Sequence, residues 1–273
     1  MKLNKLVVSQ IAWDEKIENE SVLEIFSHNK IDKIETTPFK ILGEFKEINK
    51  NLVLDFKNFW NSQGISIVSM QALLFGGPSG NIFDPTTAVV LTERLRLVIQ
   101  MAEIVGATRL VFGSPGARLK GSLSELEAID KAAGFFRPLS DYAFEHGTMI
   151  CIEPNPKGYG ADFINNSKQA QQLNQAVASQ GFGIHLDCGG MTMEGEDAVA
   201  AIRQIGSGFQ HFHVSNVNLQ PISTSTINYE NIKQTLNEIN YNQYVSLEMK
   251  RVDDQLKSFK ESVARFSQVY ADL

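Results

Sequence analysis

Short apolar runs rich in β-branched residues alternate along the chain with longer segments in which apolar residues recur every three or four positions. Runs of the first kind are typical of strands buried on both faces, and the second pattern is typical of amphipathic helices. The predicted strands are residues 6–10, 33–36, 65–70, 109–112, 149–153, 183–187, 210–214 and 244–248. A helix is expected after each strand, and the clearest are residues 85–105, 123–146, 167–180, 229–239 and 254–270.

Residues that begin and end helices occur at the boundaries of this pattern. Pro85 suits the first turn of a helix, where the N–H that proline lacks would have no partner in any case. Gly64, Gly106, Gly147 and Gly181 each precede a predicted strand, at points where a left-handed residue would end the preceding helix. The boundaries therefore support the alternation of strands and helices.

Eight strand–helix units of about 30 residues each predict a closed parallel barrel, the (β/α)₈ or TIM barrel, as a single domain over residues 1–273. No proline-rich or low-complexity stretch marks a boundary between domains. The alternative is a doubly wound sheet, which would carry a Gly-x-Gly-x-x-Gly turn after the first strand. Residues 9–13, Ser-Gln-Ile-Ala-Trp, contain no such turn, so the barrel is the stronger prediction.

The composition restricts the partners. Hydrophobic residues make up 43% of the chain and charged residues 21%, which is typical of a soluble globular protein. The net charge is −6, whereas a protein that binds duplex nucleic acid needs a cationic face to displace counterions. No apolar run approaches the roughly 20 residues that cross a bilayer. We therefore expect neither nucleic acid nor a membrane as a partner.

The opening residues and the cysteines bear on the cell compartment. The first ten residues lead into a strand and lack the basic, apolar and small-residue zones of a secretory signal. Cys151 and Cys188 have no Cys-x-x-Cys spacing and do not suggest a disulfide framework. A cytoplasmic location is the expectation.

Four residues of metal-ligand type lie at the ends of the last four predicted strands: Glu153, Asp187, His213 and Glu248. Their spacings of 34, 26 and 35 residues each correspond to about one strand–helix unit. Because the carboxyl ends of barrel strands form one rim, each strand would deliver one ligand to a common point. Taken singly, each residue could instead cap a helix or pair with a lysine or arginine.

Three carboxylates at apolar strand ends would repel one another and would be costly to bury without a counter-charge. A divalent cation between them removes both costs. Three oxygen ligands and one imidazole nitrogen suit Mn²⁺, Mg²⁺ or Co²⁺, and Zn²⁺ is compatible with them. The sequence therefore predicts one divalent metal ion at the barrel rim.

Several motifs, including the segments around these four residues, match those of a known superfamily. The motifs are residues 9–13 (Ser-Gln-Ile-Ala-Trp), 34–38 (Ile-Glu-Thr-Thr-Pro), 111–115 (Val-Phe-Gly-Ser-Pro), 152–156 (Ile-Glu-Pro-Asn-Pro), 186–190 (Leu-Asp-Cys-Gly-Gly), 211–213 (His-Phe-His) and 247–250 (Leu-Glu-Met-Lys). With them the chain resembles, over nearly its whole length, the xylose-isomerase-like barrels, in particular sugar phosphate isomerase/epimerase proteins of the ketose 3-epimerase type. The resemblance implies that the four residues bind one metal ion.

The resemblance also implies a reaction. It makes Glu153 and Glu248 an acid/base pair in an isomerase or epimerase that acts on a small sugar, ketose or polyol derivative. One carboxylate would abstract the proton next to the carbonyl, an ene-diolate would form, and the other would return a proton. A metal-dependent dehydratase would use the same base and then expel hydroxide.

Three positions depart from the ketose epimerase pattern. A substrate-binding histidine is replaced by Gly190, an arginine by Leu219, and a glutamate by Tyr159. The metal ligands thus match the family more fully than the sugar-binding residues do.

Further residues are candidates for contact with substrate. Strand alternation directs His185 and His211 into the barrel, where they would bind substrate, support a metal ligand, or serve as buried structural histidines. Glu35 ends the second strand and would bind a substrate hydroxyl or form a salt bridge across the barrel mouth. Trp13 follows the first strand, where its indole would either stack on a sugar or pack in the core.

Basic residues near the rim would suit an anionic substrate. Arg118, with Lys120, follows a Gly-Ser-Pro-Gly segment and could hold the phosphate or carboxylate of a phosphorylated or acidic sugar. Lys250 follows Glu248 by two residues and is expected to point inward, where it could bind substrate or neutralise the carboxylate cluster. Residues 74–85 are long for a loop of this kind and could form a lid.

Two other classes of function remain open. Endonuclease IV shares the fold but needs a trinuclear zinc cluster with additional histidines, and this chain has five histidines in all. A barrel that binds a sugar without converting it would keep the same pocket. The family resemblance also allows a homo-oligomer.

Overall fold

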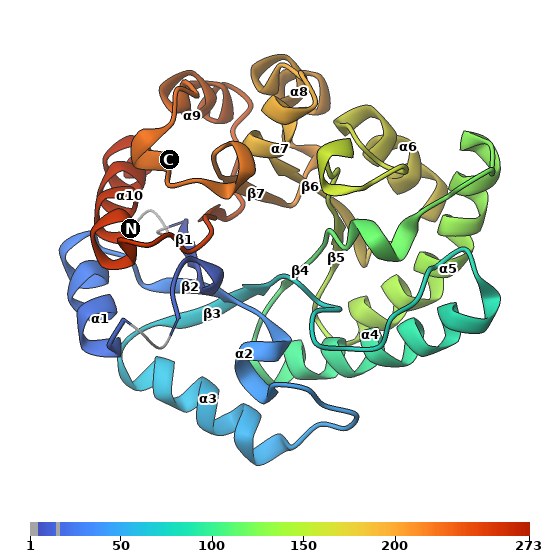
Figure 1. The fold of residues 1–273 in the computed structure, drawn as a ribbon, viewed down its shortest axis with the longest axis horizontal. Coiled ribbons are helices and arrows are strands. Elements are labelled where there is room, and N and C mark those ends of the chain that lie inside the picture. The colour runs from blue at the N-terminus through green and yellow to red at the C-terminus, as the bar shows by residue number, and fades with distance from the viewer. Residues whose placement is uncertain (1–4, 15–16) are drawn as a thin grey trace.

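The computed structural model describes residues 5–14 and 17–273. Its strands form a closed parallel barrel in the order β1 to β8, in which β8 pairs with β1 (Figure 1). The strands are β1 (Leu6–Ser9), β2 (Lys33–Thr36), β3 (Ser66–Met70), β4 (Arg109–Phe112), β5 (Ile150–Ile152), β6 (Phe182–Asp187), β7 (His211–Val214) and β8 (Val245–Leu247). The predicted (β/α)₈ barrel is confirmed.

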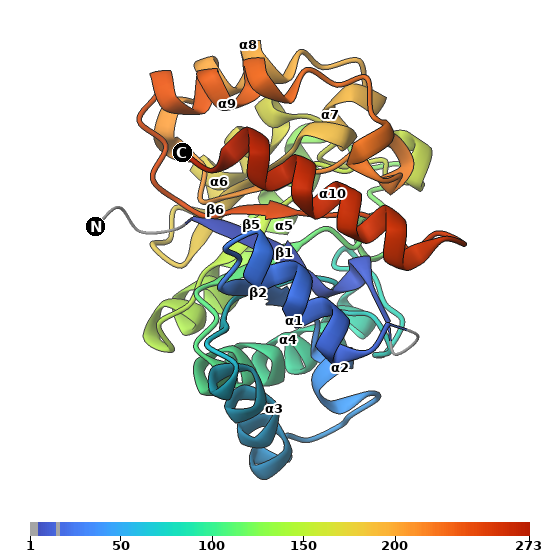
Figure 2. The ribbon, with the colours of Figure 1, turned by 90° about the vertical axis from the view of Figure 1, so that its left-hand side faces the viewer.

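Helices surround the barrel, and α10 closes the ring by packing beside α1 and α9 (Figure 2). The α-helices are α1 (Asn19–His28), α2 (Pro38–Leu42), α3 (Lys50–Ser62), α4 (Pro85–Val105), α5 (Glu125–Glu145), α6 (Ser167–Val177), α7 (Cys188–Met193), α8 (Ala198–Ile205), α9 (Tyr229–Glu238) and α10 (Gln255–Tyr270). Within the described residues, no helix is both long and apolar enough to span a membrane.

The glycines before the strands act in two different ways. Gly64, Gly106 and Gly147 have positive φ angles of 73°, 90° and 68°, as expected for residues that end a helix. The expectation for Gly181 was wrong, because α6 ends at Ala178, which adopts the left-handed conformation. Gly181 is needed for space instead: a Cβ there would lie 1.8 Å from the carbonyl oxygen of Ser140.

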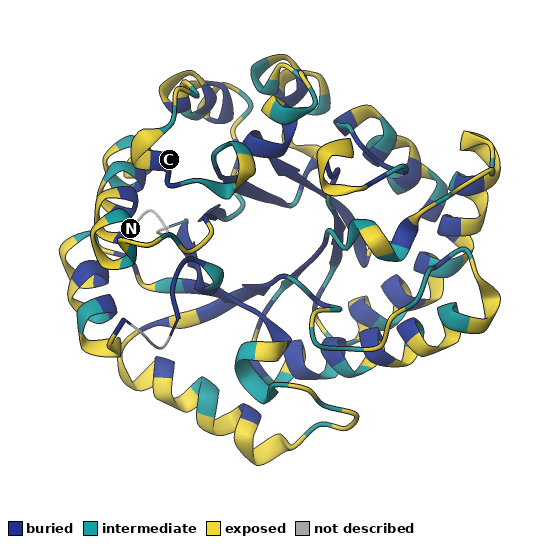
Figure 3. Ribbon diagram, in the orientation of Figure 1, coloured by how far each residue is buried: buried dark blue, intermediate teal, exposed yellow. Residues whose placement is uncertain are grey.

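The two faces of the strands differ in chemistry. Val8, Ile34 and Leu186 are examples of residues in the apolar core between the strands and the helices. The outer faces of the helices are exposed (Figure 3). The alternate positions point into the barrel and carry mainly polar side chains. These buried inward residues include Ser9, Glu35, Ser69, His185, His211, His213 and Ser246. The interior of such a barrel is usually filled with branched apolar residues, so the polar interior of this barrel indicates a functional site.

Candidate metal centre

The four predicted ligands meet at the carboxyl-terminal end of the barrel. Glu153 follows β5, Asp187 ends β6, His213 lies in β7 and Glu248 follows β8. One possible ligand atom from each residue lies within 4.8 Å of those of the other three. Asp187, His213 and Glu248 are buried, and Glu153 is partly exposed. This is a separation that one ion can bridge.

Asp187 is held so that one of its oxygens stays available. Its Oδ1 accepts hydrogen bonds from the backbone N–H groups of Gly189, at 2.8 Å, and Gly190, at 3.3 Å. The hydroxyl of Ser215 donates to the same oxygen. All three bonds go to Oδ1, so Oδ2 is the atom left for a cation.

His213 presents one nitrogen to the same point. Its Nε2 lies 2.8 Å from Oε1 of Glu35, while its Nδ1 lies 3.1 Å from Oε2 of Glu248. Burial would lower the pKa of His213, but the negative charges of Glu35 and Glu248 outweigh burial and raise this pKa well above its ordinary value. A cation at Nδ1 would take the place of the proton that Glu248 attracts there.

The charges of the cluster are unfavourable without a cation. Desolvation, reinforced by Glu248 and Asp187, raises the pKa of Glu153 to about 8. Desolvation and the charge of Glu248 raise the pKa of Asp187 to about 6. A divalent ion would reverse both shifts, because it favours the ionised carboxylates. The donor set, the position of Nδ1 of His213 and the crowded acids all fit such an ion.

Gly113 gives the carboxylate of Glu153 its space. A Cβ at position 113 would lie 2.5 Å from Oε2 of Glu153 and 3.3 Å from Oδ1 of Asn155. Sequence reasoning did not identify this role, although Gly113 directly follows β4, beside the strand that carries Glu153.

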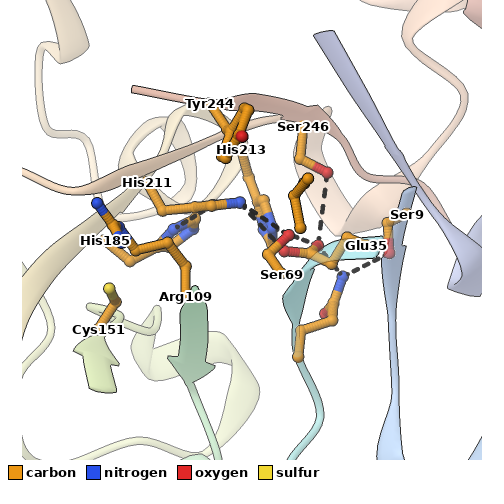
Figure 4. A network of polar contacts seen from close by, with 12 residues as sticks. Ser9, Glu35, Ser69, Arg109, Cys151, His185, His211, His213, Tyr244 and Ser246 are labelled. Atoms are coloured by element: carbon orange, nitrogen blue, oxygen red, sulfur yellow. Dashed lines mark hydrogen bonds and ion pairs between the residues drawn. The ribbon is translucent and has the colours of Figure 1, made fainter. Parts of the chain in front are cut away.

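Beneath the four ligands lies a fully buried group of polar side chains. Figure 4 shows Glu35 of β2 facing the imidazoles of His211 and His213 of β7 across the barrel interior. Burial alone would raise the pKa of Glu35, but the two histidines outweigh burial and lower the pKa to about 2. Burial lowers the pKa of His211 to about 3 and holds the pKa of His185 well below its ordinary value. Glu35 is therefore an ionised carboxylate, and His185 and His211 are neutral.

The expectation that Arg118 holds a substrate anion does not agree with its position, because its side chain is fully buried. The guanidinium donates to the carbonyl oxygens of Gly113, at 2.8 Å, and Glu153, at 2.9 Å. It also donates to Asn155 Oδ1 at 2.7 Å and to the carbonyls of Phe163 and Ile164. Arg118 ties together the loops after β4 and β5, and its donors are occupied.

Trp13 also lies away from the centre. Its indole is buried and packs against Phe26, Trp60 and Phe259, at ring centroid distances of 5.7, 6.4 and 5.2 Å. These rings come from α1, α3 and α10, so Trp13 belongs to the core outside the barrel and is not placed to stack on a substrate.

Three further positions singled out in the sequence are Lys250, Gly190 and Tyr159. Lys250 is exposed, and its backbone N–H donates to the carbonyl of Leu219 at 2.7 Å. Gly190 is buried and could carry a side chain, since a Cβ would make ordinary contacts with Pro156. Burial and the negative charges of Asp187, Glu248 and Glu153 raise the pKa of the Tyr159 hydroxyl.

Comparisons with known proteins agree with this geometry. Among curated proteins, no sequence matches the chain at a significant level. The chain is similar in structure to 3-keto-D-glucoside 4-epimerase from E. coli in its apo form, with a TM-score of 0.79 and 15% identity over 97% of this chain and 99% of that one. It is similar to D-psicose 3-epimerase with D-tagatose from Clostridium cellulolyticum H10, with a TM-score of 0.79 and 16% identity over 98% and 99%. It is also similar to an L-ribulose 3-epimerase, with a TM-score of 0.80 and 14% identity over 98% and 95%.

At these identities the structural likeness establishes the fold. The family is established by sequence, because the model of the xylose isomerase-like TIM barrel matches residues 30–269. The chain belongs to the xylose isomerase-like TIM barrel family.

Proposed function

We propose that this protein is a divalent-metal-dependent isomerase or epimerase that moves a proton next to the carbonyl of a small sugar, ketose or polyol derivative. The observation that carries the proposal is the convergence of Glu153 and Glu248 on the point shared with Asp187 and His213. The similar structures of a 3-keto-D-glucoside 4-epimerase and of ketose 3-epimerases support the substrate class.

The four residues divide into two pairs by chemistry. Asp187 and His213 would hold the ion and take no part in proton transfer. Glu153 and Glu248 would hold it and also exchange protons with the substrate, because a carboxylate has a second oxygen free for that purpose. When bound, a divalent ion offsets the negative charge that develops on the substrate oxygens.

Glu153 and Glu248 follow β5 and β8, so they approach the substrate from different sides of the barrel mouth. One carboxylate takes the proton as the C–H bond breaks, and the electron pair moves into the carbonyl to give an ene-diolate. The other carboxylate returns a proton to the opposite face of the same carbon, which inverts it. Arg118 and Gly113 contribute indirectly, since they fix the backbone and the space around Glu153.

The position of Arg118 bears on the kind of substrate. Its donors are occupied by the protein, and Nζ of Lys120 donates to the carbonyl of Leu123 at 2.9 Å and lies 3.5 Å from Glu125. These two basic residues are therefore not placed to bind a phosphate. We favour a substrate without a phosphate group.

Exchange of solvent deuterium into the substrate tests the proposal. The Mn²⁺-loaded protein would be incubated in D₂O with ketoses that include D-tagatose and D-allulose, the sugars bound in similar structures. We expect the wild type to form the epimer with deuterium at one carbon next to the carbonyl, and we expect no epimer after Glu153→Gln or Glu248→Gln. Formation of the epimer at the wild-type rate in either variant would exclude the acid/base assignment, and loss of hydroxide with exchange would indicate the dehydratase.

A further inference from the structure

Glu35 is a fully buried carboxylate, and its two oxygens lie within ion-pair distance of the two histidines of β7. Its Oε1 accepts from Nε2 of His213 at 2.8 Å and from Nε2 of Gln71 at 2.9 Å. Its Oε2 lies 3.2 Å from Nε2 of His211. Glu35 stands on β2, across the barrel from β7, and is not part of the four-residue cluster.

The carboxylate decides which nitrogen of His213 carries the proton. Oε1 of Glu35 already accepts a hydrogen bond from Nε2 of Gln71, and Nε2 of His213 donates to the same oxygen when it carries a hydrogen at the observed 2.8 Å. When His213 is neutral, its other nitrogen, Nδ1, is then a bare lone pair. Nδ1 is the atom that faces Glu248 and the ligand cluster.

The hydrogens on the rings of His211 and His185 can be assigned in the same way. If Nε2 of His211 carries its hydrogen and donates to Oγ of Ser69 at 3.2 Å, its Nδ1 is an acceptor, and this Nδ1 lies 3.2 Å from Nδ1 of His185. His185 then donates from Nδ1 and leaves Nε2 bare, which agrees with the absence of a hydrogen bond at Nε2 among the described residues. The opposite arrangement would point a lone pair of His211 at the carboxylate.

We propose that Glu35 is a positioning residue that fixes His213 with its hydrogen on Nε2 and thereby presents Nδ1 to the divalent ion. The proposal rests on the metal centre of the proposed function, but it concerns a residue that does not touch the ion. A carboxylate behind a ligating imidazole orients the ring and raises its basicity, and removing such a partner weakens metal binding by about 10- to 100-fold.

Mn²⁺ titration of the Glu35→Gln variant tests this role. The amide preserves shape but removes the charge, so we expect affinity for Mn²⁺ to fall by about 10- to 100-fold. Glu103→Gln is the matched control, since it removes the same charge from α4, where Glu103 contacts His146 at 2.8 Å. The control should bind Mn²⁺ within about twofold of the wild type, because exposed charges far from the site are screened.

The outcomes separate this proposal from the metal centre itself. Wild-type affinity in Glu35→Gln would overturn the role of Glu35 and leave the metal centre intact. Failure of the wild type to bind Mn²⁺, or unchanged binding after Asp187→Ala, would instead overturn the metal centre.

A second measurement serves if Glu35→Gln does not fold. In the wild-type protein loaded with Zn²⁺, ¹⁵N NMR of the imidazoles should show His213 bound to the metal through Nδ1 with a hydrogen on Nε2. Coordination through Nε2 would overturn the proposal.

Discussion

Replacing Gly113 with alanine tests how tightly Glu153 is confined. The backbone of Gly113 does not have a positive φ, so alanine is compatible with its conformation. The added Cβ would lie 2.5 Å from Oε2 of Glu153, whereas ordinary contacts begin near 3.4 Å. The carboxylate must therefore move by about 1 Å, because the neighbouring atoms cannot overlap with the new methyl group.

A displacement of about 1 Å is large for a metal ligand, since ligand distances are held to within about 0.2 Å. Misplacement of that size at a reacting group costs about 100-fold in rate. We expect Gly113→Ala to lower deuterium exchange by about that factor and to weaken Mn²⁺ binding, while the protein stays folded.

Gly116 provides the control for this experiment. It lies in the same loop, it has no positive φ, and a Cβ there would have no heavy atom within 4 Å. Gly116→Ala should retain exchange and Mn²⁺ binding. If Gly113→Ala exchanges deuterium and binds Mn²⁺ as well as Gly116→Ala does, the carboxylate of Glu153 is not where the reasoning requires it.

Three further predictions concern the surroundings of the site. Arg118→Met should destabilise the protein by about 3 kcal/mol or more in urea unfolding, because buried carbonyl groups lose their donors; unchanged stability would contradict the role of Arg118. Trp13→Ala should cost about 3–5 kcal/mol of stability without changing KM, and a raised KM in an equally stable protein would instead indicate contact with substrate. Because the pKa is about 8 for Glu153 and about 6 for Asp187, protons compete with the ion for these carboxylates, and the affinity for Mn²⁺ should rise between pH 6 and pH 8. Calorimetry in buffers of different ionisation enthalpy should detect the release of protons when Mn²⁺ binds. An affinity that does not change with pH would refute this prediction.

The fold and the convergence of the four candidate ligands could be predicted because they depend on local pattern. Once the strands are recognised, a closed parallel barrel fixes where each strand ends, and Glu153, Asp187, His213 and Glu248 all lie at strand ends. Helix ends were predicted correctly where a glycine adopts a left-handed conformation. The prediction was wrong at Gly181, where glycine is needed because the backbone of the neighbouring helix α5 leaves no space for a Cβ.

Contacts between distant segments could not be predicted in this way. Arg118 occupies a glycine-containing loop that suggests exposure, yet the carbonyls of two loops turn toward it and need its donors. The pairing of Glu35 with His213 joins residues 178 positions apart on two strands that are not neighbours in the barrel. Strand alternation predicted that both side chains point inward, but it does not say which side chains meet across the barrel.

Anomalous scattering from a crystal soaked in Mn²⁺ would locate the ion itself. The expected result is one peak between the carboxylates of Glu153, Asp187 and Glu248 and Nδ1 of His213, with ion-to-ligand distances of about 2.0–2.2 Å. A fully occupied peak elsewhere, or no peak at this position in protein that has been shown to bind Mn²⁺, would contradict the metal centre and the chemistry built on it.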